Sequence, residues 1–300
     1  MSGAGRPARP AVSPAGRGEL VLVATPIGNL GDLSPRAQAV LAAADLICCE
    51  DTRRTRALLS ACGIRAGNRL LSLHGHNERE RLGRVAACVG AGGTVAVVSD
   101  AGTPGISDPG AWLAAQLAAT GETVTTVPGA SSVIGALVVS GLPTERFGVE
   151  GFLPRKGSER RRRIAALMAD ERTGVVLEAP GRLAGTLADL AALDSERPVA
   201  VVRELTKVHE QVWRGPAARA AETFASDPAR GEVVIVVGGA PPGGPPEERE
   251  VEAAVGAVLA AEPEAGPRQV AARVAATLGI PKRRAYEATL RVRAGGDAAP

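Results

Sequence analysis

Short apolar runs alternate with amphipathic or alanine-rich segments along the first half of the chain. Short runs rich in valine, leucine and isoleucine are typical of buried strands, and the segments between them are long enough for helices. The predicted strands are Glu19–Ala24, Asp45–Cys49, Arg69–Leu73, Thr94–Val98 and Thr123–Val127. The predicted helices run from Pro35 to about Ala43, end near Cys62, and span Arg79–Ala91, Ala111–Ala119 and Val133–Ser140. Such regular alternation predicts a parallel sheet covered by helices on both faces.

The second half has strands with fewer helices between them. Its predicted strands are Phe147–Phe152, Gly174–Leu177, Pro198–Arg203, Glu210–Arg214 and Gly231–Val237, and its predicted helices are Glu159–Ala169 and Arg182–Leu193. Strands that follow one another without a helix favour antiparallel pairing. We therefore predict two α/β domains, with a parallel N-terminal sheet and a mixed C-terminal sheet.

Proline and glycine mark the boundaries between these parts. A length of 300 residues suggests about two domains. Gly141–Thr144 separates the two halves, and Gly239–Pro246 is a Pro/Gly linker. Beyond it, Arg268–Leu278 and Pro281–Val292 are predicted helices around a turn, which suits either a helix-turn-helix-like unit or a small packing hairpin. The predicted organisation is a disordered tail at 1–18, domains at 19–143 and 144–238, a linker at 239–250 and a helical extension at 251–300.

Composition narrows the class of protein. Apolar residues make up 45% of the chain, as in globular proteins, and aromatic residues only 2%, which argues against base-stacking platforms. No apolar stretch approaches the roughly 20 residues needed to cross a bilayer, and the start of the chain lacks the apolar core of a signal peptide. The four cysteines lack metal-type spacing, and Cys48-Cys49 lies in an apolar run. We therefore expect buried thiols in a reducing cytoplasm.

The distribution of charged residues along the sequence is more informative than the net charge. The formal net charge of +3 is too small to indicate nucleic-acid binding. Positive residues nevertheless cluster in Arg53–Arg56 and in Arg155–Arg163. Such clusters either contact phosphates or form the solvated face of a helix, and composition alone leaves both open.

The loop Ser99–Gly110 is the strongest candidate for a ligand site. It leaves the predicted strand Thr94–Val98 with three glycines and two prolines. Glycine allows a ligand to approach the backbone, and ligands of open α/β sheets bind beyond the carboxyl ends of the strands. An ordinary strand-to-helix turn is the alternative, but this loop is long for one.

Other polar motifs follow neighbouring strands. Glu50–Thr55 combines two acids and two arginines, which form either an ion-pair cluster or a substrate contact. His74 and His76 have no evident third metal ligand nearby, so a base, a hydrogen-bonding pair or a helix cap from Asn77 is favoured over a metal site. The small residues of Pro128–Ser132 open a helix whose free N–H groups suit an anion.

Seven motifs together resemble a known family. They are Ala24-Thr-Pro-Ile-Gly-Asn-Leu-Gly-Asp-Leu-Ser34, Glu50-Asp-Thr-Arg-Arg-Thr55, His74-Gly-His-Asn-Glu78, Ser99–Gly110, Pro128-Gly-Ala-Ser131, Gly151-Phe-Leu-Pro-Arg-Lys156 and Arg203-Glu-Leu-Thr-Lys207. In this order they resemble the ribosomal RNA small subunit methyltransferase I family, the RNA-modifying branch of the tetrapyrrole methylase superfamily. The resemblance is dense over Glu19–Gly238 and weak beyond it.

The resemblance implies an S-adenosylmethionine-dependent enzyme that methylates the 2′ hydroxyl of a cytidine in the decoding region of 16S rRNA. It implies two α/β domains with the cofactor in the cleft between them. The implied cofactor-binding residues are Pro26, Asp100, Gly102, Thr103, Gly105, Ile106, Ala130, Ser131, Leu205, Gly231 and Glu232. We predict that the rRNA phosphates are contacted by Arg53, Arg54, Arg155, Lys156, Arg160 and Arg161. The expected partner is the small ribosomal subunit in the cytoplasm, with no membrane and with a homodimer left open.

Methyl transfer to a ribose hydroxyl needs in-line positioning and help in removing a proton, and requires no metal. The candidates for the base, or for the group that orients the hydroxyl, are Glu50, His74, His76, Glu204 and Lys207. Lys207 would need burial or positive neighbours to act as a base.

Two local sequence features bear on which branch of the superfamily the chain resembles. Gly102-Thr103-Pro104 stands where the small-molecule branch tends to have Gly-Asp-Pro, which favours the RNA branch. Leu177–Arg182 lacks the Tyr and His that the RNA branch often carries there. The alternatives are a tetrapyrrole-type small-molecule methyltransferase, which predicts a large apolar pocket, and a non-catalytic RNA-binding or assembly factor.

Overall fold

A computed structural model describes residues 18–241, 246 and 248–296 of the chain. The predicted disordered tail, apart from Gly18, and part of the predicted linker lie outside these residues. The chain divides into two compact units, Met1–Gly239 and Ala240–Pro300.

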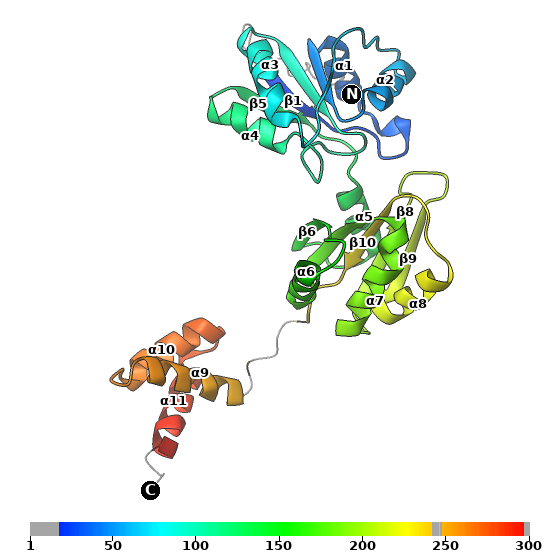
Figure 1. Cartoon of the computed structure of the whole chain (residues 1–300). Helices are drawn as coiled ribbons and strands as arrows, with labels where there is room; N and C mark the ends of the chain where they lie inside the picture. Colours follow the sequence, from blue (N-terminus) through cyan, green and yellow to red (C-terminus); the bar gives the residue numbers. More distant parts are fainter. Residues whose placement is uncertain (1–17, 242–245, 247, 297–300) are drawn as a thin grey trace, which may run out of the picture. The chain divides into compact units, whose positions relative to one another are not determined.

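The first sheet has the order β3-β2-β4-β1-β5 and is parallel throughout. Its strands are β1 (Glu19–Val23), β2 (Leu46–Cys49), β3 (Leu70–Ser72), β4 (Thr94–Val98) and β5 (Thr123–Val127) (Figure 1). The helices that follow these strands are α1 (Pro35–Ala43), preceded by a 3-10 turn η1 (Leu30–Asp32), α2 (Thr52–Ala61), α3 (Glu78–Gly90) and α4 (Ala111–Ala119). The predicted parallel sheet is confirmed.

The alternation of side chains along the strands builds a core on each face of this sheet. In β4, Ala96 and Val98 pack in the core that includes Leu41 of α1 and Leu59 of α2. Val95 and Val97 pack in the core on α3 and α4. Cys48 and Cys49 are fully buried free thiols in β2, as the apolar run predicts.

The second sheet is mixed, as predicted, with the order β6-β7-β10-β8-β9. Its strands are β6 (Phe147–Phe152), β7 (Thr173–Glu178), β8 (Pro198–Arg203), β9 (Gln211–Pro216) and β10 (Val233–Val237). Only β6 and β7 pair in parallel, and the other neighbours are antiparallel.

Four helices cover the second sheet. One face packs on α6 (Ser158–Ala169), α7 (Leu183–Leu193) and α8 (Ala217–Ser226), and a 3-10 turn η2 (Pro180–Arg182) precedes α7. The strand residues Val175, Ala200, Val202, Val234 and Val236 pack instead with α5 (Ser132–Ser140). Helix α5 precedes the segment Gly141–Thr144 but belongs by packing to the second sheet, so it carries the chain from one sheet to the other. Helix α8 was not predicted, because its apolar residues are mostly alanines.

The C-terminal unit is a three-helix cluster. Helices α9 (Glu248–Ala261), α10 (Pro267–Leu278) and α11 (Lys282–Gly296) enclose an apolar core that includes Val251, Val255, Val270 and Val274. Gly279 ends α10 with a φ of 63°, a left-handed conformation that glycine adopts without strain. The two predicted helices match α10 and α11, and α9 was not predicted individually.

Within the described residues, no helix is long and apolar enough to cross a membrane.

Candidate functional site

A cavity of about 430 Å³ lies between the loops at the carboxyl edge of the first sheet and one end of the second sheet. The first sheet and its loops contribute Ile27, Glu50, Arg54, Asp100, Ala101, Gly102, Thr103, Ile106, Ser107 and Asp108, and the start of α5 contributes Ser131, Ser132 and Val133. The second sheet contributes Phe152, Leu177, Glu178, Ala179, Pro180, Val202, Leu205, Gly231, Glu232, Val233 and Val234. The volume falls in the usual range for small-molecule sites.

Strand order brings the loop after β4 against the loops after β1 and β5. Because β4 and β5 both flank β1, their carboxyl ends are neighbours. The Thr25 and Gly102 backbones exchange hydrogen bonds of 2.8 and 3.1 Å, and the Thr103 hydroxyl donates to the Ala130 carbonyl over 3.3 Å. Gly102 has a φ of 83°, and a Cβ there would lie 3.4 Å from Ile27 Cγ2. The glycine thus suits both the turn and the close approach of a ligand.

Backbone strain gathers at this cavity. The described non-glycine residues with positive φ are Ser107 at 63°, Glu204 at 50° and Thr206 at 67°. Ser107 lines the cavity, and the other two flank Leu205, which also lines it. Conformations of this kind persist only where their surroundings hold them, and they are frequent at functional sites.

An ion-pair network holds the loop at residues 204–207. Lys207 Nζ lies 2.9 Å from Glu204 Oε1 and 3.3 Å from Glu232 Oε2, and the Glu232 N–H donates to Glu204 Oε1 over 2.9 Å. The Glu232 N–H, together with the hydrogen bond from Lys207, lowers the pKa of Glu204. Partial burial works to lower the pKa of Lys207, but its hydrogen bond to Glu204 and the charge of Glu232 outweigh it and raise this pKa. Lys207 thus lies between two carboxylates, whereas action as a base would need burial or positive neighbours to lower its pKa.

Three carboxylates face the cavity from the first sheet. Burial, followed by the charge of Asp100, raises the pKa of Glu50. Burial, followed by the charge of Glu50, raises the pKa of Asp108 to about 6. Asp100 accepts the Asp51 N–H over 3.1 Å and pairs with Arg54 over 3.4 Å. Asp108 was not among the predicted site residues, although it lies in the glycine-rich loop, because only its burial beside Glu50 distinguishes it.

The two histidines lie beside this acidic group and outside the cavity wall. The imidazole of His74 is close enough to Glu50 to act on its pKa, in the direction opposite to burial. His74 Nδ1 is buried without a hydrogen-bond partner among the described residues. The rings of His74 and His76 are 6.1 Å apart between centroids. Asn77 accepts the His74 N–H over 2.8 Å, so it shapes this turn.

The structure brings together most of the residues predicted to bind the cofactor. Those that line the cavity are Asp100, Gly102, Thr103, Ile106, Ser131, Leu205, Gly231 and Glu232. Pro26 lines a small neighbouring pocket with Arg54 and Asp100. Gly105 donates its N–H to the Pro109 carbonyl over 3.2 Å and so shapes the loop, and Ala130 holds Thr103. Apolar walls, carboxylates that suit a sulfonium cation and close-approach glycines fit S-adenosylmethionine.

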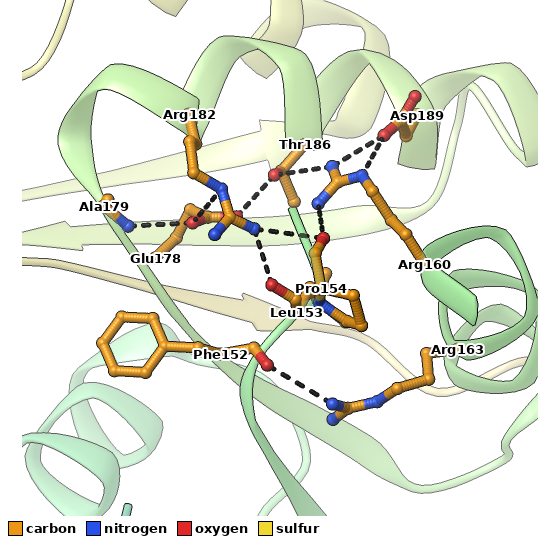
Figure 2. A network of polar contacts seen from close by, with 10 residues as sticks. All are labelled: Phe152, Leu153, Pro154, Arg160, Arg163, Glu178, Ala179, Arg182, Thr186 and Asp189. Atoms are coloured by element: carbon orange, nitrogen blue, oxygen red, sulfur yellow. Dashed lines mark hydrogen bonds and ion pairs between the residues drawn. The ribbon is translucent and has the colours of Figure 1, made fainter. Parts of the chain in front are cut away.

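A buried polar network holds the other wall of the cavity (Figure 2). Glu178, with its side chain fully buried, accepts hydrogen bonds from the Ala179 N–H at 2.9 Å and the Thr186 hydroxyl at 2.6 Å, and pairs with Arg182 at 3.1 Å. Arg182 in turn donates to the Leu153 carbonyl over 2.7 Å. The segment Leu177–Arg182, in which the resemblance led us to expect a Tyr and a His, therefore anchors the loop after β6 through Glu178 and Arg182.

The same network includes Arg160, one of the predicted RNA contacts. Arg160 pairs with Asp189 at 2.7 Å and donates to the Thr186 hydroxyl at 3.0 Å and the Pro154 carbonyl at 3.2 Å. With its side chain only 12% exposed, Arg160 is bonded within the protein, unlike the exposed arginines of the same basic run. Figure 2 shows its guanidinium turned inward to these partners.

The other predicted RNA-binding residues are exposed. Arg155, Lys156 and Arg161 lie on the surface, on the loop before α6 and on that helix. Arg53 has a side chain that is 92% exposed, and Arg54, at 68%, extends from the cavity wall. These five exposed cations are called the basic rim below, and Arg54 is the one among them that lines the cavity.

Comparisons with known proteins agree with this geometry. The family model of the Tetrapyrrole (Corrin/Porphyrin) Methylases matches residues 19–221. The chain is 49% identical over 224 residues to ribosomal RNA small subunit methyltransferase I of Mycobacterium tuberculosis (strain CDC 1551 / Oshkosh), covering 74% of this chain and 78% of that protein. It is 50% identical over 226 residues to the protein of that name from Xylella fastidiosa (strain Temecula1 / ATCC 700964), covering 74% and 82%.

A solved structure supports the fold. The uroporphyrin-III C-methyltransferase of Thermus thermophilus, complexed with S-adenosylhomocysteine, is similar with a TM-score of 0.51 at 22% identity, covering 74% of this chain and 97% of that one. Given the matched family model and the close relatives, the chain belongs to the tetrapyrrole methylases and, among them, to the ribosomal RNA small subunit methyltransferase I family of S-adenosylmethionine-dependent methyltransferases.

Proposed function

We propose that this chain transfers the methyl group of S-adenosylmethionine to the 2′ hydroxyl of a cytidine in the decoding region of 16S rRNA. The observation that carries the proposal is a cofactor-sized cavity with the carboxylates of Glu50, Asp100 and Asp108 on one wall and the exposed cation of Arg54 beside them. The names of the relatives, which concern the RNA of the small subunit, support the same substrate class.

The cofactor would supply an electrophilic methyl group. Gly102, Thr103 and Ile106 would cradle it from the first sheet, and Leu205 with Gly231 would close over it from the second. The strained backbone at residues 204–207 places Leu205 against the cavity before any ligand arrives. Such preorganisation matters because a displacement reaction depends on the acceptor lying in line with the methyl carbon.

The carboxylates of Glu50 and Asp108 are the proposed acceptors of the ribose proton. Both line the cavity, and both have a raised pKa because of burial. Asp108, with a pKa of about 6, is ionised at neutral pH and is a better base than an ordinary carboxylate. Asp100 is less suited because Arg54 and the Asp51 N–H already occupy its oxygens. Glu204 is bound to Lys207, so its proposed role is to hold the loop.

The proposed RNA contacts are Arg53, Arg54, Arg155, Lys156 and Arg161, which are exposed and can reach phosphates. With few aromatic residues to stack bases, a folded subunit surface suits this rim better than free single strands. The proposal includes the small subunit as partner and the cytoplasm as location. A homodimer is the assembly state that sedimentation should test.

Labelled S-adenosylmethionine tests the proposal. The protein is incubated in parallel with purified small subunits, naked 16S rRNA and a tetrapyrrole precursor, and the RNA is digested to nucleosides for mass spectrometry. Label in 2′-O-methylcytidine from the subunit is the expected result. Label in the tetrapyrrole alone would identify a small-molecule methyltransferase, and saturable cofactor binding without any transfer would indicate a non-catalytic RNA-binding factor.

A further inference from the structure

The C-terminal unit has a groove of its own on helices α10 and α11. Its volume is about 450 Å³, and it is lined by Arg268, Ala271, Ala272, Lys282, Arg283 and Tyr286. All the charged residues in this lining are cationic, and Tyr286 is the one tyrosine of the chain. These residues are called the basic groove below.

The cations of the basic groove are available to a ligand. Arg268 and Lys282 are exposed and form no ion pair with the described residues. Arg283 is 89% exposed, and its Nε lies 3.5 Å from Glu287 Oε1, a surface pair worth little in free energy. The groove therefore offers three accessible positive charges.

Four arginines outside the groove lining, Arg273, Arg284, Arg291 and Arg293, have intramolecular partners among the described residues. Arg273 pairs with Glu262, and Arg291 pairs with Glu248 and Glu252. Arg284 and Arg293 donate to the carbonyls of Pro246 and Ala265. These arginines hold the helices together. The cations that line the groove are not needed for this purpose and remain accessible to a ligand.

The groove also has geometry that suits a nucleotide. Arg268 and Lys282 lie in the first turns of α10 and α11, where the helix dipole favours an anion. Tyr286 is half-buried, with one side packed on the core of the unit and the other lining the groove. A tyrosine fixed in this way provides a face for a base, and the small side chains of Ala271 and Ala272 leave room above it.

We propose that the basic groove binds a single-stranded segment of RNA, with phosphates on Arg268, Lys282 and Arg283 and a base on Tyr286. The choice of RNA rests on the proposed function. A protein partner fits less well, because two alanines and one tyrosine give few apolar anchors beside three charges. A second RNA site on a unit joined through a Pro/Gly-rich sequence raises the effective concentration of the substrate at the first site.

Matched charge reversals test the groove in the full chain. Arg268→Glu and Lys282→Glu are compared with Arg249→Glu, an exposed first-turn arginine of α9 that lies outside the groove lining. Binding to a naked 16S rRNA transcript is measured with S-adenosylhomocysteine present, so that no turnover occurs, over a series of salt concentrations. Thermal melting verifies that each variant is folded.

Each groove variant should bind the transcript about five-fold to ten-fold more weakly at moderate salt, with the slope of log Kd against log salt reduced by about one. Arg249→Glu should change neither quantity. Tyr286→Phe should bind like the wild type, and Tyr286→Leu, which keeps apolar packing, should bind more weakly. Equal effects at all three charged positions, or none, would overturn the proposal.

The outcomes separate this inference from the proposed function. If no RNA is methylated but the groove variants lose affinity for the transcript, the function fails and the groove stands. If the subunit is methylated and the groove variants bind the transcript with full affinity and slope, the groove fails and the function stands. Loss of affinity for the assembled subunit alone would indicate a ribosomal protein as the occupant and would overturn the RNA assignment.

Discussion

Gly28 and Lys207 lie so close together that a side chain at position 28 would clash with the lysine. A Cβ at Gly28 would lie 2.4 Å from Lys207 Cγ and 2.9 Å from Thr206 Oγ1. Gly28 follows β1 in the first sheet, whereas Lys207 follows β8 in the second, so this contact joins the loops of the two sheets. Lys207 is itself fixed by Glu204 and Glu232. The contact therefore positions the strained loop and, with it, Leu205 on the wall of the cavity proposed to bind the cofactor.

Gly28→Ala should weaken cofactor binding by forcing this loop away. The added methyl overlaps Lys207 Cγ and Thr206 Oγ1, and overpacking of this kind costs about 1–3 kcal/mol. We expect about ten-fold weaker binding of S-adenosylhomocysteine by calorimetry. Gly83→Ala is the control, because a Cβ there meets nothing within 4 Å. Unchanged affinity in Gly28→Ala would show that the loop does not support the cofactor.

The ion pair of Glu204 should make this loop sensitive to acid. The folded-state pKa of Glu204 is lowered, so its contribution to stability is complete above the unfolded pKa of about 4.3 and is lost as pH falls through the folded value. Glu204→Gln should therefore melt at a lower temperature than the wild type at pH 7, and the difference should shrink below pH 4. A difference that persists in acid would mean that the carboxylate charge does not hold the loop.

Much of the fold was predictable because the strands are short segments bounded by turn residues, a pattern that is visible in the sequence. The apolar runs at β4, β5, β6 and β8 were predicted with the observed bounds, since turn residues flank them. Helix α8 was missed, because its buried positions are mainly alanines such as Ala217 and Ala220, which give a weak apolar signal. Helix α5 was predicted, but the sheet against which it packs depends on tertiary contacts that no local pattern specifies.

The site residues were predictable where glycine and proline set the backbone shape. They were not predictable where the role of a side chain depends on its burial. Glycine and proline mark the loop that holds Gly102 and Thr103, so its residues could be chosen from sequence. Arg160 and Arg161 are neighbours in one basic run, and nothing in that run says that the first turns inward to Asp189 and Thr186. Asp108 likewise resembles any loop aspartate until Glu50 is placed beside it.

Asp108→Asn should separate catalysis from stability. Burial holds the pKa of Asp108 at about 6 in the folded protein, above that of the unfolded chain. The folded state thus binds the proton more tightly, and stability falls as pH rises through this interval. The variant should melt at an equal or higher temperature at pH 8, while kcat falls by about 100-fold or more if Asp108 is the base.

The pH profile supplies a second readout for Asp108. In the wild type, kcat should decline below about pH 6 as the carboxyl becomes protonated. This limb should disappear from the residual activity of Asp108→Asn. If Glu50→Gln abolishes the limb and Asp108→Asn leaves it intact, the base is Glu50.

Arg160→Ala and Arg161→Ala form a matched pair that distinguishes a structural arginine from an RNA contact. Arg160 has three partners in the network around Thr186, so its removal deletes charge-assisted hydrogen bonds made by a mostly buried guanidinium and should cost about 1–3 kcal/mol of unfolding free energy. Arg161 is exposed on the same helix, and its loss should leave stability within about 0.5 kcal/mol of the wild type. Urea denaturation measures both changes.

The salt dependence of RNA binding should show the opposite order. Arg161→Ala should reduce the slope of log Kd against log salt by about one for the phosphate contact it removes, whereas Arg160→Ala should keep the slope of the wild type. If the slope falls in Arg160→Ala instead, its guanidinium must leave Asp189 and Thr186 on binding, and the basic run would act as a rearranging surface. If neither slope changes, Arg161 is only part of a solvated helix face.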